Sequence, residues 1–575
     1  MAKKMSREAF VESILKKMSL EDKVGQCLTF EFHGTVLTPV LRDKILNLRC
    51  GGLRATPHVH EGLPYHLRKG REGDIQRRSP WAGPAEYAQV INRMQHWAMS
   101  RKPGIPLHIS MDCEGDFSND LGKGGVNLLP SQMGMHATGD IKLAYRCWRI
   151  IARQLRAAGV NMLHSPCVDI VVTPNNPTIG TRSFGDTPDV CARWGLAFME
   201  ALRSEGVIST AKHYPGLGVS KVDTHLAIDV NDRTVEQLWE NELYPYRKLV
   251  EAGLPAIMVA HTIFKGIDPE GAPATASERV TEFTRRKLGF EGVTVTDSIS
   301  MKGLLDYFGG EIPRTARAAL AAGNDMILVK TTEEMEIECW KEVRKGVLGG
   351  EISEGELDDH VRRILRMKYD HGLFEMYPVD HKKATVPAFK AANKATVAKA
   401  VGKCCTLLSD DDHLLPLRKE QKVLVVEPYF PLYMDRGNDF YWHSSMLWEY
   451  ISRYTPNVAN YEIINSGTDE DIAEILQKSK EFDVCVVVSV RIGSYASSTH
   501  VAEKLLDAGR KVIVLSSSPY EYSIPAKARC VLVTYGMVPP ILKNAADVLY
   551  GRRKPRGRWP LKNYTSPFDR KGVKR

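Results

Sequence analysis

The chain has 575 residues, of which 43% are hydrophobic and 26% are charged. This composition is that of a folded globular protein and excludes a mainly disordered chain. Because an ordinary domain has roughly 100–200 residues, the length predicts one large domain and at least one smaller domain. An α/β barrel is the main way in which one domain reaches about 250 residues.

The net charge of +9 is concentrated at one end of the chain. Residues 551–575 contain ten Lys or Arg and one acid, Asp569, and the remainder contains 68 basic and 68 acidic residues. A solvated basic extension explains this distribution, so we expect no nucleic-acid partner.

The sequence predicts a cytoplasmic protein with no membrane segment. Residues 11–18 are interrupted by charged side chains, which is typical of an amphipathic helix and not of a secretory signal. No run reaches 18 apolar residues. The eleven cysteines are scattered without a C-x-x-C pair, which favours reduced thiols over a disulfide framework or a zinc site. These patterns leave the oligomeric state open.

Residues 1–376 alternate short apolar runs with helical patterns such as 144–158 and 234–252. Most of the runs are uniformly apolar, as expected of strands that are buried on both faces. Alternating strands and helices predict a parallel sheet, and eight such units predict a closed (β/α)8 TIM-like barrel. The eight predicted strands are residues 27–30, 51–54, 107–111, 160–163, 207–211, 256–260, 292–296 and 325–329.

A second α/β unit is expected after the barrel. Residues 377–400 contain a linker and the start of a connecting helix, predicted over 388–401. Residues 401–575 then carry a second series of apolar runs separated by helical segments, which predicts a smaller α/β sandwich domain followed by the basic tail. The four runs are residues 423–426, 484–490, 512–515 and 531–535.

Titratable residues follow several of the predicted barrel strands, and barrel enzymes bind substrate at this end of the strands. Two carboxylates, a lysine and histidines at one rim suggest a polyhydroxylated substrate and acid/base or nucleophilic chemistry. The residues are Asp112, Lys212, His213, His261 and Asp297. His261 is left out of the predicted site, because a structural role explains a histidine at a strand end equally well.

The sequence contains no Walker-type phosphate loop. Gly216-Leu217-Gly218 begins like a dinucleotide-binding fingerprint, but Lys221 occupies the position of the third glycine. We therefore expect neither a nucleotide cofactor nor a metal.

The segment Lys212-His213-Tyr214-Pro215-Gly216, followed by Asp223-Thr224-His225, resembles the signature loop of family 3 glycoside hydrolases in their β-N-acetylglucosaminidase branch. That branch carries Lys-His-Phe-Pro-Gly, a short loop and then Asp-Ser/Thr-His. Further segments resemble the family in the same order along nearly the whole chain. They are residues 18–26, 176–185, 296–303 and 322–326 in the first part, and 414–417 and 555–560 in the second.

The resemblance implies a role for each candidate residue. It implies that Asp297 is the catalytic nucleophile and that His225, with Asp223 as its partner, is the general acid/base. It also implies that four residues bind the sugar in the first subsite: Asp112, Arg182, Lys212 and His213.

These roles agree with the chemistry of a retaining glycosidase. Such an enzyme needs one carboxylate to attack the anomeric carbon and a second group to protonate the leaving oxygen. The second group is usually a carboxylic acid, but an imidazole titrates near neutral pH and can replace it. The resemblance therefore implies hydrolysis of terminal β-linked N-acetylglucosamine in small cell-wall or chitin-derived oligosaccharides, with no cofactor.

One segment departs from the family pattern. Where the family often shows Asp-x-Glu-Gly-Gly-Arg, residues 112–117 read Asp-Cys-Glu-Gly-Asp-Phe, so Asp116 replaces the second glycine and Phe117 replaces the arginine. This departure keeps open the alternative of a catalytically silent sugar-binding protein. A phosphorylase that uses the same residues also stays open, because a neutral histidine, unlike an anionic carboxylate, would not repel phosphate. A third alternative is a β-glucosidase-like hydrolase whose acid comes from the second domain, although the Asp223–His225 pair makes a distant acid unnecessary.

Overall fold

The computed structural model describes residues 5–56, 83–116, 118–121, 126–429, 446–464, 466–492 and 496–568. Its first part is built around an eight-stranded parallel sheet with the strand order β11-β9-β7-β6-β3-β2-β1-β12. A parallel bridge between Val295 and Met326 joins the two outermost strands of that order. The predicted TIM-like barrel is thus confirmed. Its strands are β1 (Leu28–His33), β2 (Gly52–Thr56), β3 (His108–Met111), β6 (Met162–Leu163), β7 (Ile208–Tyr214), β9 (Ala256–Val259), β11 (Val293–Thr296) and β12 (Ile327–Leu328).

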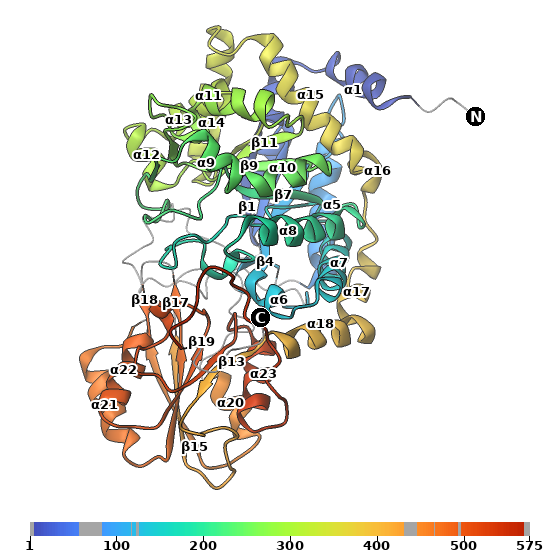
Figure 1. Ribbon diagram of the computed structural model, residues 1–575. Coiled ribbons are helices and arrows are strands. Elements are labelled where there is room, and N and C mark those ends of the chain that lie inside the picture. Colours follow the sequence, from blue (N-terminus) through green and yellow to red (C-terminus); the bar gives the residue numbers. More distant parts are fainter. Residues whose placement is uncertain are drawn as a thin grey trace.

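Amphipathic helices surround the barrel strands (Figure 1). In α7, Leu143, Cys147, Ile151 and Leu155 recur every four residues and are buried, while Asp140 caps the first turn by accepting from the N–H of Leu143 at 3.0 Å. The larger helices of this layer are α5 (Pro84–Met99), α7 (Ile141–Ala157), α8 (Pro188–Arg203), α10 (Leu243–Glu251), α13 (Ile312–Ala321), α14 (Glu333–Leu348) and α15 (Glu354–Asp370).

The helix predicted over residues 234–252 is two helices. The helix α9 (Val235–Glu240) ends at Asn241, whose backbone leaves the helical region at φ −113° and ψ −89°. The helix α10 then carries Pro245 in its first turn. Proline has no N–H, and its ring crowds the carbonyl four residues earlier, which here is that of Asn241. The helix is therefore interrupted at Asn241, and a second helix begins after it.

The second part has a six-stranded mixed sheet with the order β13-β20-β19-β16-β14-β15. Helices cover both faces of this sheet, as predicted for the α/β sandwich (Figure 1). Alternate residues of each strand enter two separate cores, as Leu424 and Val426 do on one face and Val423 and Val425 on the other. The strands are β13 (Thr406–Asp410), β14 (Val423–Tyr429), β15 (Val458–Ile464), β16 (Val484–Ser489), β19 (Val512–Ser516) and β20 (Cys530–Val533).

Two of these strands lack the apolar run that marked the others. The strand β15 lies at the sheet edge and reads Val-Ala-Asn-Tyr-Glu-Ile-Ile, and β13 pairs antiparallel with β20 across a register shift. Both strands lie at the edges of the sheet, where a strand needs no continuous apolar run, so the hydrophobic pattern of the sequence does not reveal them. The helices of this part are α20 (Met446–Ser452), α21 (Asp469–Ser479), α22 (Thr499–Asp507) and α23 (Pro539–Leu549).

Shorter elements complete the described structure. Of the helices, α18 (Ala391–Cys404) leads into the second sheet, close to the connecting helix predicted there. The others are α1 (Arg7–Leu15), α2 (Leu20–Gln26), α3 (Pro39–Leu46), α6 (Gln132–Ala137), α11 (Glu278–Glu282), α12 (Lys302–Tyr307), α16 (Leu373–Met376) and α17 (Val386–Phe389). The short strands are β4 (Cys113–Gly115), β5 (Ser118–Asn119), β8 (Val230–Asn231), β10 (Ile263–Phe264), β17 (Arg491–Ile492) and β18 (Ala496–Ser497).

All eleven cysteines are buried free thiols, as the sequence predicts. Within the described part of the chain, none of the helices has both the length and the apolar character that a bilayer crossing requires.

Candidate active site

The carboxyl ends of the barrel strands bring the predicted residues to one rim. Asp112 directly follows β3, Lys212 and His213 are the last residues of β7 before Tyr214, and Asp297 directly follows β11. The Lys212 ammonium lies 2.8 Å from the Asp112 carboxylate, although 100 positions separate them in the chain. Parallel barrel strands end on the same face, and this topology collects distant side chains into one site.

Glu114 lies at the centre of this cluster and was not among the predicted residues. Its carboxylate accepts from Nε and Nη2 of Arg182 at 2.7 and 2.9 Å, and it lies 2.7 Å from Nζ of Lys212. The side chain is only 1% exposed. Burial opposes ionisation, but the two cations outweigh it and lower the pKa of Glu114 to about 2. Glu114 therefore holds Arg182 and Lys212 in place as a buried anion.

A second carboxylate pair surrounds Arg54, which sequence reasoning also missed. Arg54, on β2, lies 2.6 Å from both Asp112 and Asp120 and is almost fully buried. Asp112 keeps 30% of its side chain exposed although both of its oxygens are ion-paired. Burial would raise the pKa of Asp112, but Lys212 and Arg54 hold it well below its ordinary value. Asp112 thus presents a fixed anion at the open side of the cluster, where a sugar hydroxyl can donate to it.

His213 is oriented by a buried aspartate in the loop that follows the fourth barrel strand, β6. Asp169 accepts from the His213 backbone N–H at 3.1 Å and lies 2.7 Å from Nδ1 of its ring. The Arg182 guanidinium, which can only donate, lies 3.2 Å from Nε2 of the same ring. The ring proton consequently belongs on Nδ1, and His213 bridges Asp169 to Arg182.

The ligating atoms of Cys167, Asp169 and His213 lie within 4.8 Å of one another, as in some metal sites. The carboxylate oxygens of Asp169 already accept from the N–H groups of His213 and Leu217 and from the Cys167 thiol. This donor set is satisfied internally, so the cluster is organised as a hydrogen-bond network.

The predicted dyad is formed on the loop between β7 and β8. Nδ1 of His225 lies 2.8 Å from Oδ1 of Asp223, and the same oxygen accepts from the His225 backbone N–H at 3.0 Å. Asp223 is 4% exposed and His225 is 32% exposed. A carboxylate can only accept here, so Nδ1 carries a proton, and any proton exchange by this ring goes through Nε2.

Asp297 is held at the end of β11 by backbone contacts. Its N–H donates to the Val259 carbonyl at 2.9 Å, and its Oδ1 accepts from the N–H of Ser298 at 2.7 Å. Burial alone would raise the pKa of Asp297, but nearby histidines and the Ser298 N–H lower it below its ordinary value. The three histidines are His213, His261 and His225. Asp297 is therefore an ionised carboxylate placed beside both the binding cluster and the dyad.

His261, which was left out of the predicted site, makes contacts that stabilise the structure. It is buried, and its Nε2 lies 2.9 Å from the Ser298 carbonyl and its Nδ1 2.7 Å from the Thr275 hydroxyl. A carbonyl only accepts, so Nε2 of His261 donates to Ser298. His261 thereby fixes the turn that carries Asp297.

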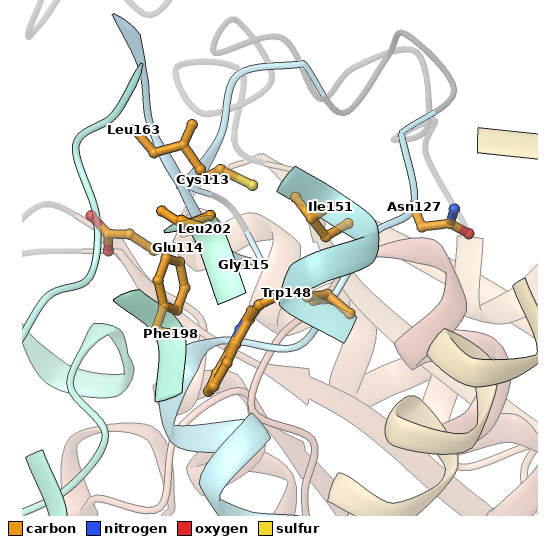
Figure 2. Close-up of a pocket in the computed structure, with 10 residues that line it drawn as sticks. Cys113, Glu114, Gly115, Asn127, Trp148, Ile151, Leu163, Phe198 and Leu202 are labelled. Carbon is orange, nitrogen blue, oxygen red and sulfur yellow. The ribbon is translucent and has the colours of Figure 1, made fainter. Parts of the chain in front are cut away.

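A small apolar pocket lies behind Glu114, between β4 and the helices α7 and α8 (Figure 2). Its lining consists of Cys113, Glu114, Gly115, Asn127, Leu129, Trp148, Ile151, Leu163, Phe198 and Leu202. Polar groups suited to a sugar are scarce in this lining. The apolar lining instead lowers the local dielectric, which strengthens the electrostatic attraction between charges such as those of Glu114 and Arg182.

Fold and rim together define a glycoside hydrolase: a TIM-like barrel followed by an α/β sandwich, with a carboxylate and an Asp–His pair at the carboxyl ends of the strands. The chain belongs to glycosyl hydrolase family 3. The model of the family's N-terminal domain matches residues 20–367, and the model of its C-terminal domain matches residues 405–571.

Individual relatives agree with this assignment. A β-N-acetylglucosaminidase/β-glucosidase of Cellulomonas fimi is 26% identical over 88% of this chain and 92% of its own. A β-hexosaminidase of Hydrogenovibrio crunogenus is 32% identical over 54% of this chain and 81% of its own. The solved structure of a family 3 β-N-acetylglucosaminidase from a Paenibacillus strain superposes with a TM-score of 0.82 and 28% identity, over 95% of this chain and 99% of that one.

The segment that departs from the family pattern is only partly described. Phe117 lies outside the described residues. Asp116 is buried and points away from the cluster, because its carboxylate accepts from the backbone N–H of Met537 at 2.7 Å. Arg54 supplies a guanidinium beside Asp112 from another strand. It lies inside a predicted strand, where nothing in the sequence marks an arginine as a site residue.

Proposed function

We propose that this protein is a retaining, exo-acting β-N-acetylglucosaminidase that hydrolyses terminal β-linked N-acetylhexosamine through a covalent glycosyl-enzyme intermediate. The observation that carries the proposal is the 2.8 Å contact between Asp223 and His225 in a site that also holds the ionised carboxylate of Asp297. The printed activities of the Cellulomonas, Hydrogenovibrio and Paenibacillus relatives support the choice of sugar.

In the first step, an oxygen of Asp297 attacks the anomeric carbon and the glycosidic bond breaks. His225 gives the proton of Nε2 to the leaving oxygen, so the aglycone departs as a neutral alcohol. Asp223 accepts the Nδ1 proton in a hydrogen bond throughout, and this keeps the ring oriented and stabilises its cationic form.

In the second step, Nε2 of His225 takes a proton from water, and the water oxygen attacks the anomeric carbon. The ester bond to Asp297 breaks, and the free sugar leaves with the same anomeric configuration as the substrate. A histidine suits both steps because an imidazole can both give and take a proton.

The binding cluster accounts for recognition of a single terminal sugar. Asp112 offers carboxylate oxygens to hydroxyl groups, while Lys212 and Arg182 offer N–H groups whose orientation is fixed by Glu114. His213 lies beside Arg182, and Asp169 holds its ring in place. Fixed donors and acceptors of this kind hold the sugar without rearrangement in the transition state. No step of this mechanism requires a cofactor.

We place the protein in the cytoplasm, where it would act on small oligosaccharides released during cell-wall turnover. The support for a reducing compartment is that all eleven cysteines are buried free thiols.

The test is a panel of aryl glycosides assayed with and without inorganic phosphate. The panel contains the N-acetylglucosaminide, glucoside, xyloside and glucosaminide. We expect the N-acetylglucosaminide to be cleaved fastest and the rate to be independent of phosphate. A glucoside preference would favour the β-glucosidase-like alternative, and formation of a sugar 1-phosphate would favour the phosphorylase. No turnover of any member would favour the silent sugar-binding protein.

A further inference from the structure

Two loops that carry binding residues are attached to the second domain by buried carboxylates. Asp116 lies two positions after Glu114, and Asp186 lies four positions after Arg182. Both aspartates are 6% exposed. Each accepts hydrogen bonds from backbone N–H groups of the second domain. Glu114 and Arg182, which bond to each other, thus each lie within a few positions of one attachment in the chain.

The attachment at Asp116 is sterically tight. Its Oδ1 accepts from the N–H of Met537 at 2.7 Å, and a Cβ built on Gly536 would lie only 2.5 Å from the same oxygen. Gly536 adopts φ +153°, and Asp116 itself adopts φ +48°, which a non-glycine residue rarely does. Nearby, the Ser131 N–H donates to the Tyr535 carbonyl at 3.1 Å. The residues 535–537 thus hold the β4 loop in one conformation.

The attachment at Asp186 uses both carboxylate oxygens. Oδ1 accepts from the N–H of Lys562 at 2.8 Å, and Oδ2 accepts from the N–H groups of Asn563 at 2.7 Å and Tyr564 at 2.8 Å. The Asn563 amide also donates to the Asp186 backbone carbonyl at 3.0 Å. Several charge-assisted hydrogen bonds to one carboxylate fix a loop strongly, because a charged acceptor makes each of them stronger than a neutral bond.

The apolar packing follows the same path. One core of the second domain continues into barrel loops through residues such as Ile179 and Leu217. Val538 and Ile541 of the second domain pack in turn into the barrel core. Figure 1 shows α6 and β4 between the barrel strands and the second sheet.

From these contacts we propose that Asp116 and Asp186 are positioning residues, through which the second domain fixes the Glu114–Arg182 pair in the geometry that binds the sugar. This inference rests on the proposed function only in taking that pair as part of the sugar site. The second domain, by this account, contributes to substrate affinity without supplying a catalytic group.

The test compares variants of the full-length chain. Gly536→Ala places a methyl group against Asp116, and Asp186→Asn removes one of the two charged acceptor oxygens. Gly509→Ala is the matched control, because Gly509 also lies in the second domain with φ +70° but a Cβ there meets no atom within 4 Å. The melting temperature of each variant is recorded beside kcat and KM, and the substrate is whichever aryl glycoside the wild type cleaves fastest.

We expect Gly536→Ala and Asp186→Asn each to raise KM at least fivefold while kcat stays within threefold of wild type. The Gly509→Ala variant should keep the wild-type KM. Folded Gly536→Ala and Asp186→Asn variants with an unchanged KM would overturn the proposal, whereas a wild type that prefers another glycoside would overturn only the proposed sugar.

A further variant covers the case in which Gly536→Ala fails to fold. Asp116→Asn keeps the size of the side chain and weakens its hydrogen bond to Met537, so it should show the same rise in KM to a smaller extent. An Asp116→Asn variant with equal losses in kcat and in the amount of folded protein, and an unchanged KM, would assign Asp116 a purely structural role.

Discussion

Arg182 and Glu114 form a two-bond ion pair, with distances of 2.7 and 2.9 Å, between loops that lie 68 positions apart in the chain. Two parallel N–H···O bonds fix the plane of the guanidinium as well as its position. The Lys212 ammonium, 2.7 Å from the same carboxylate, adds a second cation. Two cations of the proposed sugar site, Arg182 and Lys212, therefore depend on one buried acid.

Glu114→Gln should weaken binding strongly. The amide cannot neutralise Arg182 and Lys212, and one of its two polar atoms would direct N–H groups at those cations. Loss of one member of a buried charge cluster costs about 3–5 kcal/mol, so we expect KM for an aryl N-acetylglucosaminide to rise at least tenfold. Glu338→Gln is the control, because Glu338 pairs with Lys341 at the exposed surface. Equal KM values for the two variants would contradict the role of Glu114.

Replacement of His225 should affect poor leaving groups most. His225→Ala removes the group that protonates the departing oxygen, which matters for a sugar alcohol and little for a nitrophenolate. A disaccharide should lose much more activity than a nitrophenyl glycoside, and the latter should show a burst followed by slow turnover.

Azide provides an internal check on the same variant. The anion can attack the intermediate without a general base, so it should restore part of the His225→Ala rate and yield a glycosyl azide. Asp223→Ala should show a milder form of the defect, because the ring stays present but loses its 2.8 Å partner. Equal losses on both classes of substrate, without rescue by azide, would make His225 a binding residue.

The ionisation of Asp297 predicts how the first chemical step depends on pH. Its pKa lies below the ordinary value near 3.9, so the carboxylate is already anionic at roughly pH 5 and stays so at higher pH. A fluoride leaving group needs little protonation. The rate at which a 5-fluoro-N-acetylglucosaminyl fluoride inactivates the enzyme should therefore be flat from roughly pH 5 to 8. A steep rise in the inactivation rate over this range would contradict an ionised nucleophile.

Asp325 is predicted to stabilise the fold without contributing to catalysis. It is fully buried, and it accepts from Arg285 at 2.7 Å, from Arg363 at 2.8 Å and from the Thr294 N–H at 2.8 Å. Asp325→Ala leaves two arginines without their anion, so it should reduce the free energy of unfolding by about 3–5 kcal/mol. The exposed pair of Lys341 and Glu338 should contribute less than about 1 kcal/mol, which Lys341→Ala measures in the same denaturation experiment.

The contribution of Asp325 should also depend on pH. Burial opposes its charge, but Arg285, Arg363 and His360 lower its pKa below the ordinary value. As the pH falls, Asp325 is protonated in the unfolded chain before it is protonated in the folded protein. The stabilisation is therefore complete above about pH 5 and is lost progressively in stronger acid. The difference in unfolding free energy between wild type and Asp325→Ala should shrink as the pH falls below about 4. A difference that grows in acid would contradict this linkage.

The barrel could be predicted from the sequence because its strands are buried on both faces, so each appears in the sequence as a uniformly apolar run. Strand ends then located Asp112, Lys212 and Asp297, since a parallel barrel gathers these positions on one face. The pairing of Asp223 with His225 was predicted from the family resemblance, and their spacing of two positions makes the contact a local one.

Long-range pairing explains what the sequence did not reveal. Arg54 meets Asp112 and Asp120 only after β2 and β3 align, and Glu114 meets Arg182 only after two loops fold onto the rim. The attachment of Asp186 to residues 562–564 uses backbone N–H groups, which have no sequence signature. The break before α10 depends on Pro245, whose effect was hidden within an otherwise helical pattern.

Mass spectrometry of the trapped intermediate tests the central claim most directly. The enzyme is treated with the 5-fluoro-N-acetylglucosaminyl fluoride, digested at low pH and sequenced by fragmentation of the labelled peptide. We expect one 5-fluoro-N-acetylglucosaminyl ester per chain, located on Asp297 and absent from the Asp297→Ala variant. A label on any other residue, or its persistence in that variant, would contradict the assignment of Asp297 as the nucleophile.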